Sequence, residues 1–329
     1  MKKFLLIILF VTVNSYSQSI ERQVIGATGA TYTDDATVSM DFTIGELLVT
    51  TITDGTTTLT QGFHQGDVQL SINLSAVAYL QGAFLNPNTG EESLMRDDLR
   101  LAGLIPTTSP YLDGVNCNPS VFTTTGNNAI VDWIWVELRD ESTNTQVLHN
   151  QSALLQRDGD VVAIDGISSL SFKATSGNYF VVIKHRNHLG MMSSTPIELS
   201  NTTTVLNFTE ANNQITYGNN AQTINNFQSN KMCMWAGNTD GNTQVRYQGS
   251  GNDSNRIKDQ VLTDLGNTSN SNLYSFISYN TADVNLNGTI RYQGSGNDSN
   301  IIKDIILSHP NNQSSPSNLF IIMEQLPEN

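Results

Sequence analysis

One ten-residue sequence, RYQGSGNDSN, occurs twice near the end of this chain, and this duplication constrains the fold more than any other feature. It occupies Arg246–Asn255 and, 45 positions later, Arg291–Asn300. An alternating run of Asp and Asn precedes each copy. A pattern typical of a short apolar helix follows each copy, IKDQVL in the first and IKDIIL in the second. Identity of this length indicates a duplication, so the C-terminal part is predicted to fold as two copies of one unit.

The alternating oxygen-bearing residues, followed by an acid at the start of a helix, are typical of a calcium loop. Gly288 stands where such a loop turns sharply, and Ile290 would pair as a miniature strand. No acid occupies loop position 12, and the flexible QGSG segment would let a later aspartate return to the loop. The predicted ligands of the second copy are Asp283, Asn285, Asn287, the carbonyl of Thr289, and Asp298.

The first copy follows the same pattern less closely, because it begins with Asn and has Thr243 in place of the turn glycine. Two carboxylates per loop predict a modest calcium affinity, with a dissociation constant on the order of 10⁻⁴–10⁻³ M. The alternative is a metal-free turn, since Asn and Asp dominate turns without any ion. The predicted ligands of the first copy are Asn238, Asp240, Asn242, the carbonyl of Gln244, and Asp253.

The N-terminus predicts secretion. Lys2 and Lys3 precede the apolar segment Phe4–Val13 and the small residues around Ser17, which is the pattern of a signal peptide at residues 1–18. No other segment is apolar for long enough to form a membrane-spanning helix, so we expect no membrane insertion. The formal net charge of −14 disfavours nucleic acid and anionic membrane surfaces as partners.

The chain has two cysteines, Cys117 and Cys233. In a secreted protein they could form a disulfide, and the sequence leaves this open. No CxxC motif occurs, so neither a zinc knuckle nor a thioredoxin-type site is supported.

Abundant Thr, Ser, Asn and Gly between short β-branched runs predict a mainly β protein. After the signal peptide we expect a β-meander at 19–66, an antiparallel, Ig-like β-sandwich at 67–208, and the duplicated module at 209–329. The strand candidates of the sandwich are Leu70–Leu80, Ala129–Glu137, Gln146–Leu155, Val161–Ile164, Ser169–Ala174, Tyr179–His185 and Ile197–Asn201.

The segment Val131–Leu138 is apolar on both faces of its period-two pattern, which predicts a central strand buried on both sides. Trp133 and Trp135 belong to this pattern. We therefore expect both to lie in the core; the alternative is that they are exposed and stack on sugars.

Several segments carry a family resemblance. DVNLNGTIRYQGSGNDSNIIKDIIL, VDWIWVELRD (131–140), YFVVIKHRNHLGMMS (179–193) and the FTIGE and LTQGFHQ motifs (42–65) resemble secreted Bacteroidota proteins described as haemagglutinin-like or cell-surface proteins. Their C-terminal loops resemble the calcium repeats of dockerins.

The resemblance implies a secreted, non-catalytic adhesion protein that binds a glycan or a cell-surface protein. Its dockerin-like tail would either stiffen the molecule or dock a partner. The chain ends at Leu326–Asn329 without a type IX sorting domain, so we do not expect surface attachment by that route. Whether the protein stays on the cell or is released is left open.

The rival hypothesis is a secreted hydrolase accessory or a metal-dependent enzyme. His185 and His188 lie in KHRNHLG at a predicted strand end and could bind zinc if a third ligand joined them. The HxxH spacing lacks the glutamate of HExxH, and neither GxSxG nor a P-loop motif occurs. The alternative is that these histidines form the polar rim of a strand, so no catalytic residue is predicted.

Overall fold

A computed structural model describes residues 28–33, 39–44, 52–53, 58–59, 70–211, 215–225 and 227–328. The chain divides into two compact units, Met1–Val68 and Gln69–Asn329, and each is described by itself. The predicted signal peptide at 1–18 lies outside the described residues. The predicted boundary at 66/67 lies beside this division, whereas the one at 208/209 falls inside the second unit.

The described strands of the first unit form antiparallel hairpins. β1 (Thr28–Thr33) pairs with β2 (Ser39–Ile44), and β3 (Ile52–Thr53) pairs with β4 (Thr58–Leu59).

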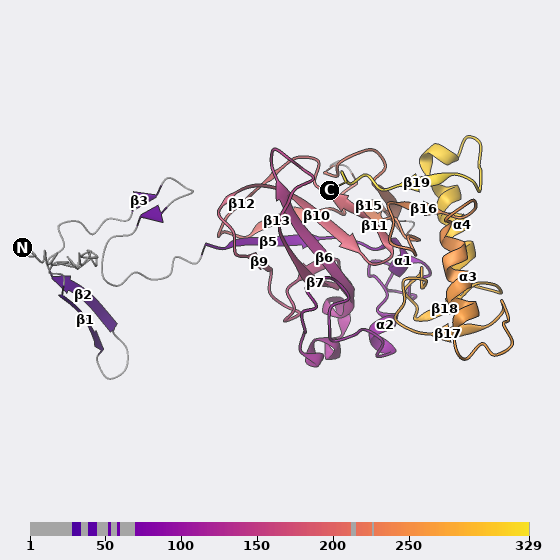
Figure 1. Ribbon diagram of the computed structural model, residues 1–329, viewed down its shortest axis with the longest axis horizontal. Coiled ribbons are helices and arrows are strands. Elements are labelled where there is room, and N and C mark those ends of the chain that lie inside the picture. Colours follow the sequence, from indigo (N-terminus) through magenta and orange to yellow (C-terminus); the bar gives the residue numbers. More distant parts are fainter. Residues whose placement is uncertain are drawn as a thin grey trace, which may run out of the picture. The chain divides into compact units, whose positions relative to one another are not determined.

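The second unit contains a nine-stranded sheet with the order β11-β10-β6-β7-β8-β5-β13, in which β12 also pairs with β10 and β9 with β5 (Figure 1). Every pairing is antiparallel except that of β13 with β5. The strands are β5 (Ile72–Val77), β6 (Ile130–Asp140), β7 (Val147–Gln156), β8 (Asp160–Val162), β9 (Leu170–Phe172), β10 (Gly177–His185), β11 (His188–Met192), β12 (Ile197–Leu199) and β13 (Thr204–Asn207).

The mainly β, antiparallel character predicted from the sequence is confirmed, but the strands follow one continuous path instead of two separate sheets. The short strand β8 causes this continuity, because it pairs with β7 on one side and β5 on the other. The sheet also curls. The Asn73 amide donates to the Ser200 carbonyl at 2.8 Å, which brings the end of β12 beside β5.

Strand β6 is central, as predicted, and pairs with both β10 and β7. Its residues from Ile130 to Arg139 are all buried. Trp133 is 0% exposed and Trp135 is 7% exposed, so both tryptophans belong to the core. The Trp133 indole N–H donates to the Pro106 carbonyl at 2.8 Å, which satisfies its polar atom. Neither ring is available to stack on a sugar.

Between β5 and β6 the chain forms short helical turns. They are α1 (Gln81–Phe84), α2 (Asp98–Leu101), η1 (Pro119–Thr123) and η2 (Gly126–Asn128). Cys117, in this segment, and Cys233 are both buried and both free, so the structure contains no disulfide between them.

A hairpin leads from the sheet to the duplicated unit. It consists of β14 (Gln222–Asn225) and β15 (Gln228–Met234). Just beyond β15, Ala236 forms an isolated bridge with His188 of β11, so the duplicated unit begins in contact with the sheet.

Both predicted C-terminal helices are confirmed as α3 (Asp253–Thr263) and α4 (Asp298–Ser308). The side chains of Asn252 and Asn297 cap them by accepting from backbone amides of the first turn. Within the described ranges, no helix has the length and apolar character needed to cross a membrane. The remaining elements are β16 (Gln244–Arg246), β17 (Ser275–Ile277), β18 (Thr289–Arg291), η3 (Pro310–Asn312) and β19 (Ile321–Met323).

The two copies exchange strands reciprocally. β17, which follows the first helix, pairs with the loop strand β18 of the second copy, with Phe276 opposite Ile290. β19, which follows the second helix, pairs with the loop strand β16 of the first copy, with Ile322 opposite Val245. The duplicated unit is therefore a pseudo-twofold pair of loop-strand-helix-strand repeats, much longer than the identical ten residues.

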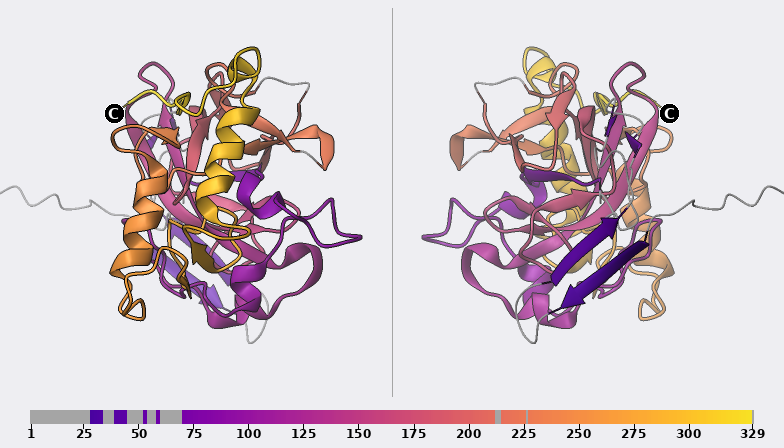
Figure 2. Two further views of the ribbon diagram at one scale, coloured as in Figure 1. Left: turned by 90° about the vertical axis from the view of Figure 1, so that its right-hand side faces the viewer. Right: turned by 90° about the vertical axis from the view of Figure 1, so that its left-hand side faces the viewer.

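The two repeats also share one hydrophobic core. The helices α3 and α4 pack side by side (Figure 2), and their apolar faces meet the exchanged strands. Neither copy therefore has a complete core of its own. The buried members are Leu189, Trp235, Ala236, Val245, Ile257, Val261, Ala282, Val284, Ile290, Ile302, Ile305, Ile306 and Ile322.

We predict that Ile302→Ala lowers the free energy of unfolding by about 2–5 kcal/mol, because it removes a fully buried side chain and leaves a cavity. Leu265→Ala, at a position that is 97% exposed, should change it by less than about 0.5 kcal/mol. Urea denaturation of the full chain measures both. Equal effects of the two substitutions would contradict the shared core.

Candidate functional site

The second loop begins at Asp283, which is fully buried. Its Oδ1 accepts from the Asn287 amide at 3.1 Å and its Oδ2 from the Gly288 amide at 2.7 Å. Gly288 has φ +80°, so the predicted sharp turn is present and requires glycine. The aspartate therefore organises the turn that follows it.

The next two predicted ligands form local turns of their own. Asn285 Oδ1 accepts from the Asn287 amide at 3.2 Å, and Asn287 Oδ1 accepts from the Thr289 amide at 2.8 Å. Thr289 opens β18. Such turns form with or without an ion, so they are compatible with both interpretations of the sequence.

Asp298 returns to the start of the loop. Its Oδ1 accepts from the Val284 amide and its Oδ2 from the Arg291 amide, both at 2.9 Å. The carboxylate thus lies beside Asp283 and joins the loop start to the end of β18. It is 1% exposed.

Asp253 occupies the same place in the first copy. Its Oδ1 accepts from the Thr239 amide and its Oδ2 from the Arg246 amide, both at 2.7 Å. It is fully buried. The Thr239 hydroxyl adds a bond of 3.1 Å to Oδ1, which Val284 cannot make in the second copy.

Asn238, at the first position of the first loop, has an unpaired oxygen. Its Nδ2 donates to the Asn242 carbonyl at 2.6 Å, which fixes the orientation of the amide because a flip would set oxygen against oxygen. Its Oδ1 is buried and has no hydrogen-bond partner among the residues with a described structure. Buried acceptors are nearly always paired, so this atom needs an explanation.

The remaining predicted ligands of the first loop resemble those of the second. The exposed Asp240 accepts from the Asn242 amide at 3.2 Å, and Asn242 Oδ1 accepts from the Gln244 amide at 2.8 Å. Gln244 opens β16, as Thr289 opens β18.

Burial dominates the electrostatics of these loops. It raises the pKa of Asp253 to about 7, with the charge of Asp240 adding to the effect. Burial also raises the pKa of Asp283 to about 6, against the opposing charge of Arg186. For Asp298, burial and then the charge of Asp283 raise the pKa well above its usual value.

Neither Asp253 nor Asp298 forms a salt bridge with any Arg, Lys or His of the described ranges. In the same part of the chain, no three His, Cys, Asp or Glu side chains converge on a metal position. A cation in either loop would rely on two carboxylates together with amide and carbonyl oxygens. This donor set suits a hard ion that accepts flexible oxygen ligands.

One residue that the sequence analysis missed connects both loops. Asn187, fully buried in the turn between β10 and β11, donates through Nδ2 to the carbonyls of Asp283 at 2.6 Å and Thr281 at 3.1 Å. Its own carbonyl accepts from the amides of Gly237 and Asn238, each at 3.1 Å. Its local sequence is an ordinary turn, so no sequence signal marks this role.

His185 and His188 do not form the solvent-exposed rim predicted as one alternative. They are 5% and 1% exposed, because the duplicated unit packs over this end of the sheet. Their Nδ1 atoms lie 3.0 Å apart, and His185 Nε2 lies 3.1 Å from Asp132 Oδ2. Asp132 thus faces the ring nitrogen opposite the one that faces His188, so the three groups share no common metal position.

The hydrogen bonds assign one tautomer to each of these histidines. The Gly82 amide donates to His188 Nε2 at 3.1 Å, so the proton of His188 lies on Nδ1. That proton faces His185 Nδ1 and the Asn187 side-chain oxygen, while His185 Nε2 donates to Asp132. Every ring nitrogen is satisfied with both imidazoles neutral.

Asp132 carries the charge of this buried group. Burial alone would raise its pKa, but the Arg186 guanidinium and the His185 hydrogen bond lower it to about 2. Arg186 Nε lies 3.0 Å from its Oδ2. The hydroxyl of Tyr279, from the duplicated unit, donates to its Oδ1 at 2.6 Å.

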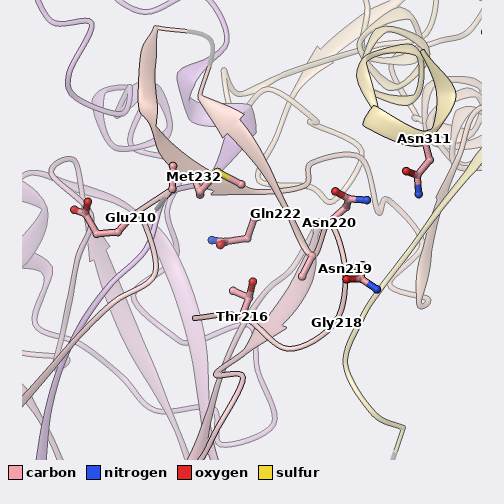
Figure 3. Close-up of a pocket in the computed structure, with 10 residues that line it drawn as sticks. Glu210, Thr216, Gly218, Asn219, Asn220, Gln222, Met232 and Asn311 are labelled. Atoms are coloured by element: carbon pink, nitrogen blue, oxygen red, sulfur yellow. The ribbon is translucent and has the colours of Figure 1, made fainter. Parts of the chain in front are cut away.

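A cavity of about 420 Å³ lies between the segment that leads into β14, strand β15 and η3 (Figure 3). Most of its lining comes from residues 210–222, and Met232 of β15 and Asn311 of η3 complete it. The lining residues are Glu210, Ala211, Thr216, Gly218, Asn219, Asn220, Ala221, Gln222, Met232 and Asn311.

Comparisons of the chain with protein-family models, with curated proteins and with solved structures find no match. The haemagglutinin-like resemblance drawn from the sequence therefore stays a prediction.

The buried histidines lower the stability of the fold in acid, whereas the raised pKa values of Asp253, Asp283 and Asp298 act in the opposite direction over the same pH range. Burial lowers the pKa of both His185 and His188. The unfolded chain takes up their protons near pH 6.5, so the stability that depends on the neutral pair is present above that pH and is lost as the pH falls. The cost is about 1.4 kcal/mol per pH unit for each proton that unfolding takes up.

We expect the free energy of unfolding of His188→Gln, measured relative to that of the wild type, to rise as the pH falls from about 6.5 to 5, because one of the two histidine protons no longer contributes. Denaturant unfolding at each pH measures the slopes. The control is His149→Gln, which lies outside the hydrogen-bonded group of His185, His188 and Asp132. Its free energy of unfolding should have the same pH dependence as that of the wild type. Parallel slopes for wild type and His188→Gln would contradict a buried neutral pair.

Proposed function

We propose that this chain is a secreted, non-catalytic surface or adhesion protein whose duplicated C-terminal unit is held in shape by two calcium ions. One observation carries the calcium assignment. Asp253 and Asp298, at equivalent places in the two copies, are buried, accept a backbone N–H at each oxygen and form no salt bridge with a cationic side chain of the described part of the chain. A buried carboxylate that stays ionised is paired with a cationic group or coordinates a metal.

The ligand chemistry favours calcium over other common ions. Both loops offer only oxygen, from carboxylates, amides and carbonyls, whereas zinc prefers nitrogen and sulfur. Calcium accepts six to eight oxygens in irregular geometry, whereas magnesium demands a near-ideal octahedron. The unpaired Oδ1 of Asn238 supplies one such oxygen at the first position of the first loop.

The proposed binding role rests on the charge and the resemblance. The net charge of −14 disfavours nucleic acid, and the family that the sequence resembles consists of surface proteins. The partner would be a glycan or a cell-surface protein. In this proposal the dockerin-like unit either stiffens the molecule or docks a further partner.

The metal-dependent enzyme weighed as the rival has no comparable support. Its histidines would need an open coordination position and access for a substrate. His185 and Asp132 have side chains that are 0% exposed, and their polar atoms already bond one another.

We expect calcium at 10 mM, roughly ten to a hundred times the predicted dissociation constant, to add about 1.4–2.7 kcal/mol of stability per filled site. Asp298→Asn should abolish binding in the second loop and Asp253→Asn in the first, because each removes half of the formal charge of its site. Calorimetric titration and thermal unfolding of the full chain, after treatment with a chelator, measure both effects.

The matched controls are Asp304→Asn and Asp259→Asn, which remove the same charge from exposed positions of the same two helices. Both should bind calcium as the wild type does. If the wild type shows neither heat of calcium binding nor a shift of its unfolding temperature at this calcium concentration, the calcium proposal is wrong.

A further inference from the structure

Part of the duplicated decapeptide is explained by the fold. Arg246 Nη1 donates to the Ser250 carbonyl at 2.7 Å, Gly249 and Gly251 have φ of +98° and +66°, and Asn252 caps α3. The aspartate that follows bridges the loop, as described above. The second copy repeats each of these contacts. These positions are identical because the backbone conformation demands them.

The other duplicated side chains have no such role. None of their polar atoms makes a hydrogen bond within the part of the chain that the structure describes, and they are identical in both copies nonetheless. They are Tyr247, Gln248, Ser250, Ser254 and Asn255, and their counterparts Tyr292, Gln293, Ser295, Ser299 and Asn300.

Four of these five side chains in the second copy line one cavity of about 410 Å³. The first copy contributes Tyr247, so both duplicated tyrosines lie at the same site. The size is within the range of small-ligand sites. The lining is Tyr247, Leu273, Tyr292, Gln293, Gly294, Asn297, Ser299 and Asn300.

A second observation comes from the first copy. Ser254, the counterpart of Ser299, is 6% exposed, and its hydroxyl is buried without a hydrogen-bond partner. A buried hydroxyl requires a donor or acceptor, and this one has none among the residues that the structure describes. The equivalent serine of the second copy, Ser299, lines the cavity.

The lining indicates the class of ligand. It contains no charged residue, which disfavours anions and cations alike. The tyrosine rings pack against the shared core of the repeats from one side, so they are held rigidly, and they carry hydroxyls. The amides of Gln293 and Asn300 are exposed and offer both donors and acceptors. Rings beside neutral donors and acceptors match a sugar, which has an apolar face and a rim of hydroxyls.

We infer that this cavity, and the equivalent surface of the first copy, bind a neutral glycan. The inference rests on the proposed binding function and places its ligand on the duplicated unit, away from the cavity in Figure 3. Two equivalent sites on one rigid unit would engage neighbouring sugars together, so weak single contacts add up to strong attachment.

The experiment uses the full chain with millimolar calcium on an array of neutral oligosaccharides of glucose, galactose, mannose and N-acetylhexosamine, followed by titration with the best ligand. The Gln293→Ala, Asn300→Ala double variant changes only exposed side chains, so folding is preserved. It should weaken binding about tenfold, the loss expected for two hydrogen bonds. Ser295→Ala, also duplicated and exposed but outside the lining, should bind as the wild type does.

Each of the other outcomes would overturn a specific part of this inference. Equal glycan binding by wild type and double variant would remove the site and leave the binding function standing. Calcium binding without any neutral glycan bound would remove the glycan inference and leave the calcium loops standing. Binding to charged glycans or to protein alone would likewise overturn the assignment of a neutral ligand.

Discussion

The hydrogen bonds of Asn187 connect the β-sheet to both halves of the duplicated unit, and the arrangement of the C-terminal part depends on them. One amide and one carbonyl from a single turn join the first residues of both loops. The residue is fully buried, so its loss would leave several backbone groups unpaired without access to water. Arg96 adds a parallel contact, donating to the Asn285 carbonyl at 2.6 Å. The loops therefore have a fixed place on the sheet.

The protein accommodates buried carboxylates in two different ways. Asp132 has a guanidinium, a histidine and a tyrosine hydroxyl around it, and its pKa is lowered accordingly. Asp253 and Asp298 are as deeply buried, yet they accept only neutral donors among the described residues, namely backbone amides and, for Asp253, the Thr239 hydroxyl. Amides orient a carboxylate but do not neutralise it. A cation bound at Asp253 and Asp298 would supply the positive charge that Arg186 supplies at Asp132.

Local patterns in the sequence predicted much of this structure. The central strand β6, the helices α3 and α4, and the return of Asp298 to its loop all follow from periodicity and from short separations along the chain. The burial of His185 and the role of Asn187 could not be predicted, because they depend on residues 50 to 100 positions away. The strand exchange was missed for the same reason, since two similar repeats permit either pairing.

The strand exchange means that a single repeat could not fold completely on its own. A molecule with only one repeat would have an open strand edge and half of an apolar core, and it could satisfy both only by associating with a second molecule. Joining two repeats in one chain turns that dimer contact into an intramolecular one, which forms at every protein concentration. The tandem arrangement is thus a fused homodimer, and its symmetry axis runs within a single polypeptide.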